Sequence, residues 1–173
     1  RGDRGALSRE AIHGMVLFNG KAGCAACHSG PLQTDHAYHA IAMPQIGPGK
    51  GDTATGGDSL GDFGRAQVAG FETEMYKFRT PSLRNTALTG PWGHDGAYNT
   101  LEAVVRHHLD PVDALESYDT AQAILPYRED LTSIDFLHHE DSANRADIAL
   151  YNELAPVDLS DTEVKRLIAF LHA

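Results

Sequence analysis

Two cysteines and a histidine stand close together near the start of the chain, in the order Cys24-Ala25-Ala26-Cys27-His28. This C-x-x-C-H spacing is the attachment signal for c-type haem. The two thiols add across the two vinyl groups on one edge of the porphyrin, and the histidine that follows presents its imidazole to the iron. The motif therefore predicts one covalent haem c, held by Cys24 and Cys27, with His28 as the proximal ligand of the haem iron.

Other interpretations of the cysteine pair fit less well. A structural zinc site normally has four protein ligands, and the chain has no second cysteine pair. A thioredoxin-like dithiol belongs to a βαβ unit, which the sequence pattern does not indicate. A chance C-x-x-C-H is rare because cysteine is rare. Since covalent haem is attached outside the bacterial cytoplasm, we expect a periplasmic or otherwise extracytoplasmic protein.

The excess of acidic side chains argues against two classes of binding partner. The chain has 173 residues, with 24 acidic and 14 basic side chains and a formal charge of −10. This acidic excess argues against nucleic acid as a partner and against an anionic membrane surface. The longest aliphatic runs are short, such as 15–18, so we expect no membrane span. The carboxylates are mostly solvated, and they can steer a basic electron-transfer partner toward the protein.

The elements that must position the motif are predicted to be helices joined by long loops. The predicted helices lie over 9–19, 82–87, a segment opening at 99–102, a segment opening at 110–111, and a segment after a capping box at 160–163. Residues 46–70 contain eight glycines, and this composition predicts a surface loop. We expect a linker over 1–6 and a single all-α domain over 7–173.

Several stretches beyond the cysteine motif carry a family likeness. They are Gly23–Pro31, Asp62–Arg65, Tyr76–Gly96, Leu101–Val105 and Leu167–Leu171. In this order they resemble the C-terminal haem domain of the bacterial di-haem cytochrome c peroxidase and MauG family. The resemblance implies a cytochrome c-like helical domain around one haem. It also implies a second haem domain or partner chain, because members of that family carry two haem domains and this chain has one C-x-x-C-H. The segment 113–157 is longer than in the family's simplest members.

His28 fills one of the two axial positions of a haem iron, and a second histidine or a methionine can fill the other. The candidates are Met43, Met75, His36, His39, His94, His107, His108, His138 and His139. With Leu101 at zero and about 100° per residue, His108 falls inside the apolar stripe of its helix and His107 falls at the border, near 240°. The resemblance points to the same residue, because this position holds a ligand methionine in the peroxidases and a tyrosine in MauG-like members. We therefore expect His28/His108 coordination, with Met75 and Met43 as the main alternatives.

Further site residues follow from side-chain chemistry and from the resemblance. Arg65 and Arg84 are candidates to pair the haem propionates, because a guanidinium matches a carboxylate in two-point geometry. The resemblance implies that His94 lies by the haem edge. It also implies that the backbone carbonyls of Thr89 and Pro91 hold a calcium ion between two domains. Trp92 is expected to pack in the core. The consecutive polar residues of 138–141, His-His-Glu-Asp, are expected to form a polar loop.

Three functional hypotheses remain open. The first is an electron-transfer haem domain, the electron-entry half of a di-haem peroxidase or MauG-like enzyme, which receives electrons from a small redox protein. In the second, the chain is itself a peroxide-reducing enzyme. In the third, it is a stand-alone mono-haem electron carrier. A homodimer is compatible with each of them.

Overall fold

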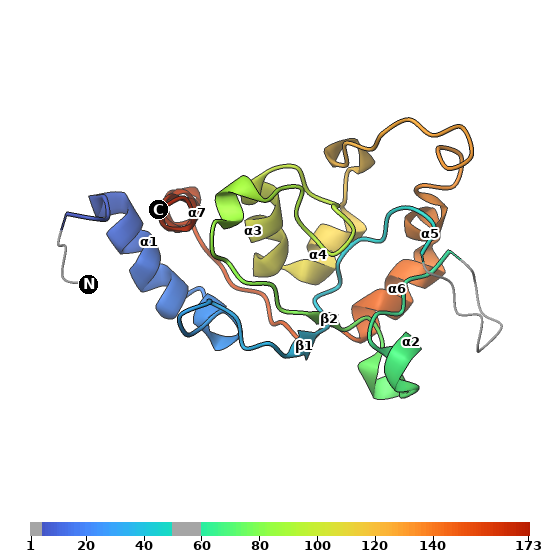
Figure 1. The fold of residues 1–173 in the computed structure, drawn as a ribbon, viewed down its shortest axis with the longest axis horizontal. Helices are drawn as coiled ribbons and strands as arrows, with labels where there is room; N and C mark the ends of the chain where they lie inside the picture. The colour runs from blue at the N-terminus through green and yellow to red at the C-terminus, as the bar shows by residue number, and fades with distance from the viewer. Residues whose placement is uncertain (1–4, 50–59) are drawn as a thin grey trace.

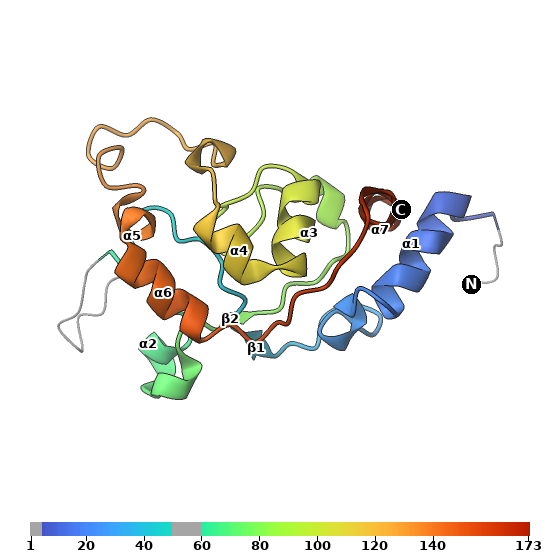
Figure 2. The same ribbon diagram turned by 180° about the vertical axis from the view of Figure 1, so that it is seen from behind.

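The computed structural model describes residues 5–49 and 60–173. In Figure 1, α1 and α7 lie at one end, α3 and α4 in the middle, and α5 and α6 at the other end, with α2 below α6. Long irregular segments connect them. Figure 2 shows the same arrangement from behind, with β1 and β2 between the middle and the lower edge of the molecule.

The described residues form seven α-helices, four short 3-10 turns and one two-stranded sheet. The α-helices are α1 (Arg9–Asn19), α2 (Ala66–Ala69), α3 (Leu101–Leu109), α4 (Pro111–Glu116), α5 (Leu137–Glu140), α6 (Ser142–Leu150) and α7 (Asp161–Leu171). The 3-10 turns are η1 (Cys24–Ala26), η2 (Glu72–Glu74), η3 (Thr86–Leu88) and η4 (Thr120–Gln122). Strands β1 (Tyr38–His39) and β2 (Phe78–Arg79) pair antiparallel. The all-α prediction is confirmed.

Local capping chemistry explains where the two longest helices begin. The Ser8 hydroxyl accepts a hydrogen bond from the Ala11 amide at the start of α1, and Gly20 ends that helix. At the start of α7, Ser160 and Glu163 form the predicted capping box. Asp110 caps α4, which has proline at its first turn. These boundaries agree with the sequence prediction.

Helices α1 and α7 pack closely because a glycine lies at their contact. A Cβ on Gly14 would lie 1.9 Å from the carbonyl oxygen of Arg166 in α7. Beside this contact, the rings of Phe18 and Phe170 meet edge to face with centroids 5.2 Å apart. An ion pair joins Arg166 to Glu10 at 2.8 Å. The first and last helices of the chain therefore close one end of the fold together.

The segment between α6 and α7 forms backbone hydrogen bonds with two elements in the middle of the molecule. It runs from α6 past β1 toward the other end, as Figure 2 shows in dark orange to red. Along this path the Glu153 amide donates to the Ala40 carbonyl at 2.9 Å, and the Val157 amide donates to the Leu109 carbonyl at 2.7 Å. The segment thus joins β1 to the C-terminal end of α3 without forming a regular element.

Three local expectations are corrected. The helix predicted over 82–87 is absent, and only the short turn η3 forms at the end of this segment. Asn85 adopts a left-handed φ of +60°, which interrupts a helix. The Ser82 hydroxyl donates to the Leu32 carbonyl, which is distant in the sequence. Helix α3 is capped by Thr100 and not by Asn99, whose side chain bonds to the Gln122 carbonyl.

The glycine-rich segment 46–70 is also more structured than a surface loop at its C-terminal end. Residues 50–59 lie outside the described part of the chain. After them, Phe63 packs against the buried cluster that contains Tyr76, and residues 66–69 form α2. A Cβ on Gly64, which has φ +59°, would lie 2.6 Å from the Lys77 carbonyl. A long-range contact, which composition does not reveal, therefore orders this part.

Within residues 5–49 and 60–173, no helix combines the length and the apolar character needed to cross a membrane.

Candidate haem site

The cysteine motif lies on a tight turn directly after α1. Gly23 has a left-handed φ of +69°, and the turn η1 begins at Cys24. The His28 amide donates to the Cys24 carbonyl at 2.9 Å, so the turn places the histidine beside the two cysteines. The two cysteines are not joined in a disulfide. Burial raises the pKa of the Cys24 thiol to about 11 and also raises the pKa of Cys27.

The His28 imidazole is held by one of its two nitrogens. Nδ1 lies 3.1 Å from the Gln33 carbonyl oxygen, to which it donates, so Nε2 carries the lone pair. Burial lowers the pKa of His28, which favours the neutral ring that a metal requires. A backbone carbonyl on Nδ1 is the usual outer partner of a ligating histidine, because it fixes the orientation and the tautomer of the ring.

His108 has the same arrangement on α3. Its Nδ1 lies 2.7 Å from the Val104 carbonyl oxygen, one helical turn earlier, so Nε2 again carries the lone pair. Burial lowers the pKa of His108, and the charge of His28 lowers it further. In both His28 and His108 a backbone carbonyl holds Nδ1, so the lone pair lies on Nε2.

His107, the neighbour of His108, has both nitrogens engaged with the protein. Its Nδ1 lies 3.0 Å from the Tyr98 hydroxyl, and its Nε2 lies 2.7 Å from the Ile41 carbonyl oxygen. The side chain is only 1% exposed, and burial lowers its pKa to about 3. His107 is therefore a neutral core residue with no nitrogen left for iron.

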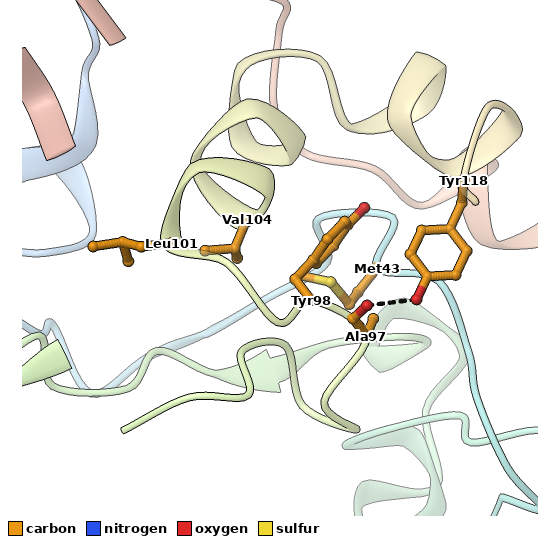
Figure 3. Close-up of a cluster of buried hydrophobic side chains, with 6 residues drawn as sticks. All are labelled: Met43, Ala97, Tyr98, Leu101, Val104 and Tyr118. Carbon is orange, nitrogen blue, oxygen red and sulfur yellow. Dashed lines mark hydrogen bonds between the residues drawn. The ribbon is translucent and has the colours of Figure 1, made fainter. Parts of the chain in front are cut away.

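The remaining candidates for the sixth ligand lie elsewhere. Met43 packs in a buried cluster with Tyr98 and Leu101 (Figure 3). Met75 packs against a second cluster around Tyr76. His39 is held between two carboxylates, with Asp35 at 2.9 Å from Nε2 and Glu153 at 2.9 Å from Nδ1.

The two adjacent histidines of the 138–141 segment were expected in a polar loop, and this expectation is wrong. His138 and His139 lie on α5 and are only 3% and 6% exposed. His139 meets the Tyr118 ring edge to face, with centroids 5.1 Å apart. The tertiary packing of this short helix buries residues that look solvated in the sequence.

The predicted propionate and haem-edge residues occupy separate places. Arg65 lies over the Tyr38 ring at 4.5 Å and pairs with Glu74 at 3.4 Å. Arg84 points toward the end of the cysteine loop, with Nη1 3.5 Å from the Pro31 carbonyl oxygen. Of the two, Arg84 lies nearer the motif, and its guanidinium pairs with no carboxylate among the described residues. The assignment of Arg65 and Arg84 to propionates stays a prediction.

His94 lies in a compact environment of its own. Its ring stacks on Phe78 with centroids 3.6 Å apart, and its Nε2 lies 3.8 Å from a carboxylate oxygen of Asp95. Together with Gln45 and Asp62 it lines a cavity of about 150 Å³. The haem-edge role of His94 stays a prediction.

The loop expected to hold calcium lies at the surface. Thr89 and Pro91 are exposed, and neither backbone carbonyl accepts a hydrogen bond from the described residues. Both oxygens are thus available to a hard cation. Trp92 packs against the cluster around Tyr98 and donates from Nε1 to the Thr86 carbonyl at 3.0 Å, as expected of a core residue.

The walls beside the motif are apolar, as a porphyrin requires. A buried cluster of Phe18, Val105, Val164 and Leu167 joins α1, α3 and α7. Partly buried side chains pack against it, among them Cys24, Ala25, Leu83, Leu109 and Leu159. Next to them, at the C-terminal end of α3, lies a separate cavity of about 340 Å³. Its lining combines the apolar residues Leu109, Pro156, Val157 and Leu159 with the charged residues Arg106, Asp110 and Asp158. Two thiols, two oriented imidazoles and an apolar wall fit a covalent haem.

These features define the class: a helical c-type cytochrome domain. No family model matches the chain. The chain is 30% identical to cytochrome-c peroxidase IdrP1 of Denitromonas iodatirespirans over 99% of its own length and 42% of that protein. It is 39% identical to methylamine utilization protein MauG of Methylorubrum extorquens over 62% of its length and 27% of that protein.

Solved structures agree in fold. A MauG-like protein associated with microbial copper homeostasis matches with a TM-score of 0.62 and 26% identity, covering 96% of this chain and 43% of that one. The diheme peroxidase BthA of Burkholderia thailandensis matches with a TM-score of 0.63 and 22% identity, covering 97% of this chain and 43% of that one. The chain belongs to the di-haem cytochrome c peroxidase and MauG family, and it spans less than half the length of these relatives.

Proposed function

We propose that this chain is an electron-transfer domain whose single haem c is ligated by His28 and His108. The observation that carries the proposal is the matched pair of imidazoles, in which each Nδ1 is held by a backbone carbonyl, so that Nε2 is the nitrogen with the lone pair that could bind iron. If His28 and His108 both bound the iron, peroxide would find no open site on the haem. The haem supplies one-electron chemistry when bound, and the chain's residues set its potential and its access.

The chain's own residues have three separate tasks in this proposal. Cys24 and Cys27 fix the porphyrin edge to the turn after α1. Gln33 and Val104 orient the two ligand rings through their carbonyls, which also makes the imidazoles more basic. The apolar cluster of α1, α3 and α7 would exclude water from a haem held beside the motif and would give it surroundings of low dielectric constant.

The test is the electronic state of the iron in the haem-loaded protein. We expect optical and EPR spectra of a fully low-spin ferric haem with two imidazole ligands. His108→Ala should convert the iron to a high-spin form, whereas His107→Gln, a change at the neighbouring position, should leave it low-spin. An unchanged low-spin spectrum in His108→Ala would sink the assignment of His108.

The proposed partners follow from the family and from the charge. The chain is inferred to be the electron-entry half of a two-haem assembly, because its relatives are named as diheme peroxidases or peroxidases and it spans less than half of them. A small basic redox protein suits the net charge of −10 as donor. A periplasmic location accords with covalent haem. Thr89 and Pro91 are proposed to share a calcium ion with the second domain.

The alternative is that the chain reduces peroxide by itself. This function requires one labile axial ligand, and a mono-haem carrier requires none. Stopped-flow mixing of the ferrous protein with hydrogen peroxide separates them. Slow oxidation that follows a second-order rate typical of outer-sphere transfer supports the electron-transfer role, and rapid oxidation with saturation in peroxide supports the enzyme.

A further inference from the structure

A thiol, a carboxylate and an imidazole lie together beside the cysteine turn. The Sγ of Cys27, a carboxylate oxygen of Asp35 and a ring nitrogen of His39 lie within 4.8 Å of one another. The backbone supports this contact, because the Asp35 amide donates to the Cys27 carbonyl at 2.8 Å. Cys27 supplies one of the two sulfurs for covalent attachment. The imidazole of His39, on β1, therefore lies beside a point at which the porphyrin edge would be attached.

The hydrogen bonds of His39 require a ring with two protons. Its Nε2 lies 2.9 Å from Asp35 and its Nδ1 lies 2.9 Å from Glu153. An ionised carboxylate can only accept hydrogen bonds, so both nitrogens donate and the ring is an imidazolium. The bond with Asp35, followed by that with Glu153, raises the pKa of His39 above its usual 6.5. Two carboxylates balance the charge of this cation.

The other groups around His39 come from separate segments of the chain. Lys77, directly before β2, pairs with Glu153 at 3.0 Å, and the partner of His39 across the sheet is the uncharged Phe78. The charge of His39 lowers the pKa of His28, yet no hydrogen bond or ring contact joins the two imidazoles in the part of the chain that the structure describes. The His39 side chain is 29% exposed, so its protons can exchange with solvent.

We propose that His39 is a redox-linked proton site, which binds one proton when the haem attached through Cys27 accepts one electron. In the step, the donor protein delivers one electron to the ferric iron, which becomes ferrous. Solvent supplies one proton, which forms the second N–H bond of the ring, and reoxidation releases both. This inference rests on the proposed function, because it requires a haem that changes its charge by one electron.

The direction of the coupling follows from the charges. Reduction removes one positive charge from the iron, so a nearby imidazolium becomes easier to form. By linkage, a protonated His39 favours the ferrous haem by the same factor, and the haem potential is higher when His39 is protonated than when it is neutral. Glu153 keeps Lys77 as a partner when the ring is neutral, so Nδ1, which faces Glu153, is the nitrogen that releases the proton. Proton uptake thus leaves the total charge of the site unchanged on reduction.

The test is potentiometric titration of the haem-loaded protein from about pH 5.5 to about pH 9.5. At a fixed applied potential, the ratio of ferrous to ferric haem should fall by about fivefold or more across this range. His39→Gln should abolish the change and keep the ratio that the parent has at high pH, because glutamine is neutral. His36→Gln, the matched control at an exposed position of the same loop, should retain the change.

A second measurement needs no variant. Electrochemical reduction of the parent in weakly buffered solution, with a pH indicator, counts the protons bound per electron. We expect this count to pass through a maximum within the range where the potential changes, and to fall on either side of it. A potential independent of pH in the parent, a pH dependence retained in His39→Gln, its loss in His36→Gln, or no proton uptake on reduction would overturn the proposal.

The optical spectrum of each sample reports the ligation separately. A low-spin haem with a potential independent of pH would contradict the redox-linked proton and leave the proposed function intact. A high-spin haem that still takes up a proton through His39 would contradict the proposed ligation alone. A change of spin state in His39→Gln would mean that His39 binds the iron, and this result would also overturn the proposal.

Discussion

The imidazoles of His107 and His108, neighbours in the sequence, lie 5.9 Å apart with their planes at 85°. Successive residues on a helix project about 100° apart, so the two rings enter different surroundings. His107 is enclosed by Tyr98 and the Ile41 carbonyl, whereas the Nδ1 of His108 is held by the Val104 carbonyl of its own helix. His107 thus has both nitrogens engaged in the core, which is why we propose His108, and not His107, as the iron ligand.

Replacement of the proposed sixth ligand by methionine should raise the haem potential. A thioether donates less electron density to ferric iron than an imidazole, and axial ligands span about 0.8 V in proteins. We expect His108→Met to shift the potential upward by a substantial part of that range, with a low-spin spectrum and a sulfur–iron charge-transfer band. Potentiometric titration measures it. A potential within error of the parent would contradict ligation by His108.

Removal of the buried histidine should destabilise the fold. His107→Ala leaves the Tyr98 hydroxyl and the Ile41 carbonyl without partners and opens a cavity. We expect a loss of about 2–4 kcal/mol in the free energy of unfolding, measured by urea denaturation. The matched control is His172→Ala at the exposed end of α7, which should change the free energy by less than about 0.5 kcal/mol.

The close approach of the two terminal helices should not tolerate an added methyl group. Gly14→Ala places a Cβ against the Arg166 carbonyl, which forces α1 and α7 apart. Overpacking of this kind costs about 1–3 kcal/mol, although alanine favours the helix itself. Thermal unfolding of the haem-loaded protein should show a lower Tm. Val16→Ala, which is on the same helix and 64% exposed, serves as control; an equal Tm for both variants would argue against the clash.

The stability of the protein should depend on pH through His39. The hydrogen bond with Asp35 raises the pKa of His39 above its usual 6.5. The same bond is the chief reason that the pKa of Asp35 is lowered from 3.8 to about 2. Burial raises the pKa of Glu153, but its bonds from His39 and Lys77 outweigh this and lower it overall. These three groups and Lys77 face one another.

The sign of the effect follows from the two shifts. A raised histidine pKa stabilises the fold below pH 6.5, and this contribution disappears as the pH rises through the raised pKa. A lowered carboxyl pKa stabilises the fold above pH 3.8, and this contribution disappears as the pH falls through about 2. The Tm difference between the parent and His39→Gln should therefore be greatest between pH 4 and 6.5. A difference that is constant with pH would disprove the coupling.

The sequence predicted the parts of this molecule that depend on neighbouring residues. Ser8 and Gly20 limit α1, and Ser160 and Glu163 begin α7, because caps act over three or four positions. The helix expected after Thr80-Pro81 failed because Ser82 bonds to Leu32, far away in the sequence. The hydrogen bonds of His107 with Tyr98 and Ile41 could not be predicted for the same reason. Helical periodicity places His107 at the border of the apolar stripe, but it does not reveal that the Ile41 carbonyl bonds to its Nε2.

In the candidate site, too, the sequence predicts what neighbouring residues decide and misses what distant contacts decide. The C-x-x-C-H motif carries its chemistry in five consecutive residues, so the sequence alone predicts its function. The ion pairs of His39 cannot be predicted in this way, because one of them needs Glu153, which is 114 positions away in the sequence. His138 and His139 looked like a polar loop because nothing near them indicates that Tyr118 and α6 would cover them.

The bond from the Val157 amide to the Leu109 carbonyl has a consequence for maturation of the protein. A chain that emerges from its N-terminus presents Cys24 and Cys27 long before Val157 is available to hold the end of α3. The attachment machinery therefore meets the cysteine turn while the opposite wall is still open. On the proposed function, thioether formation is expected to come first, and the bond from Val157 to the end of α3 is expected to form afterwards.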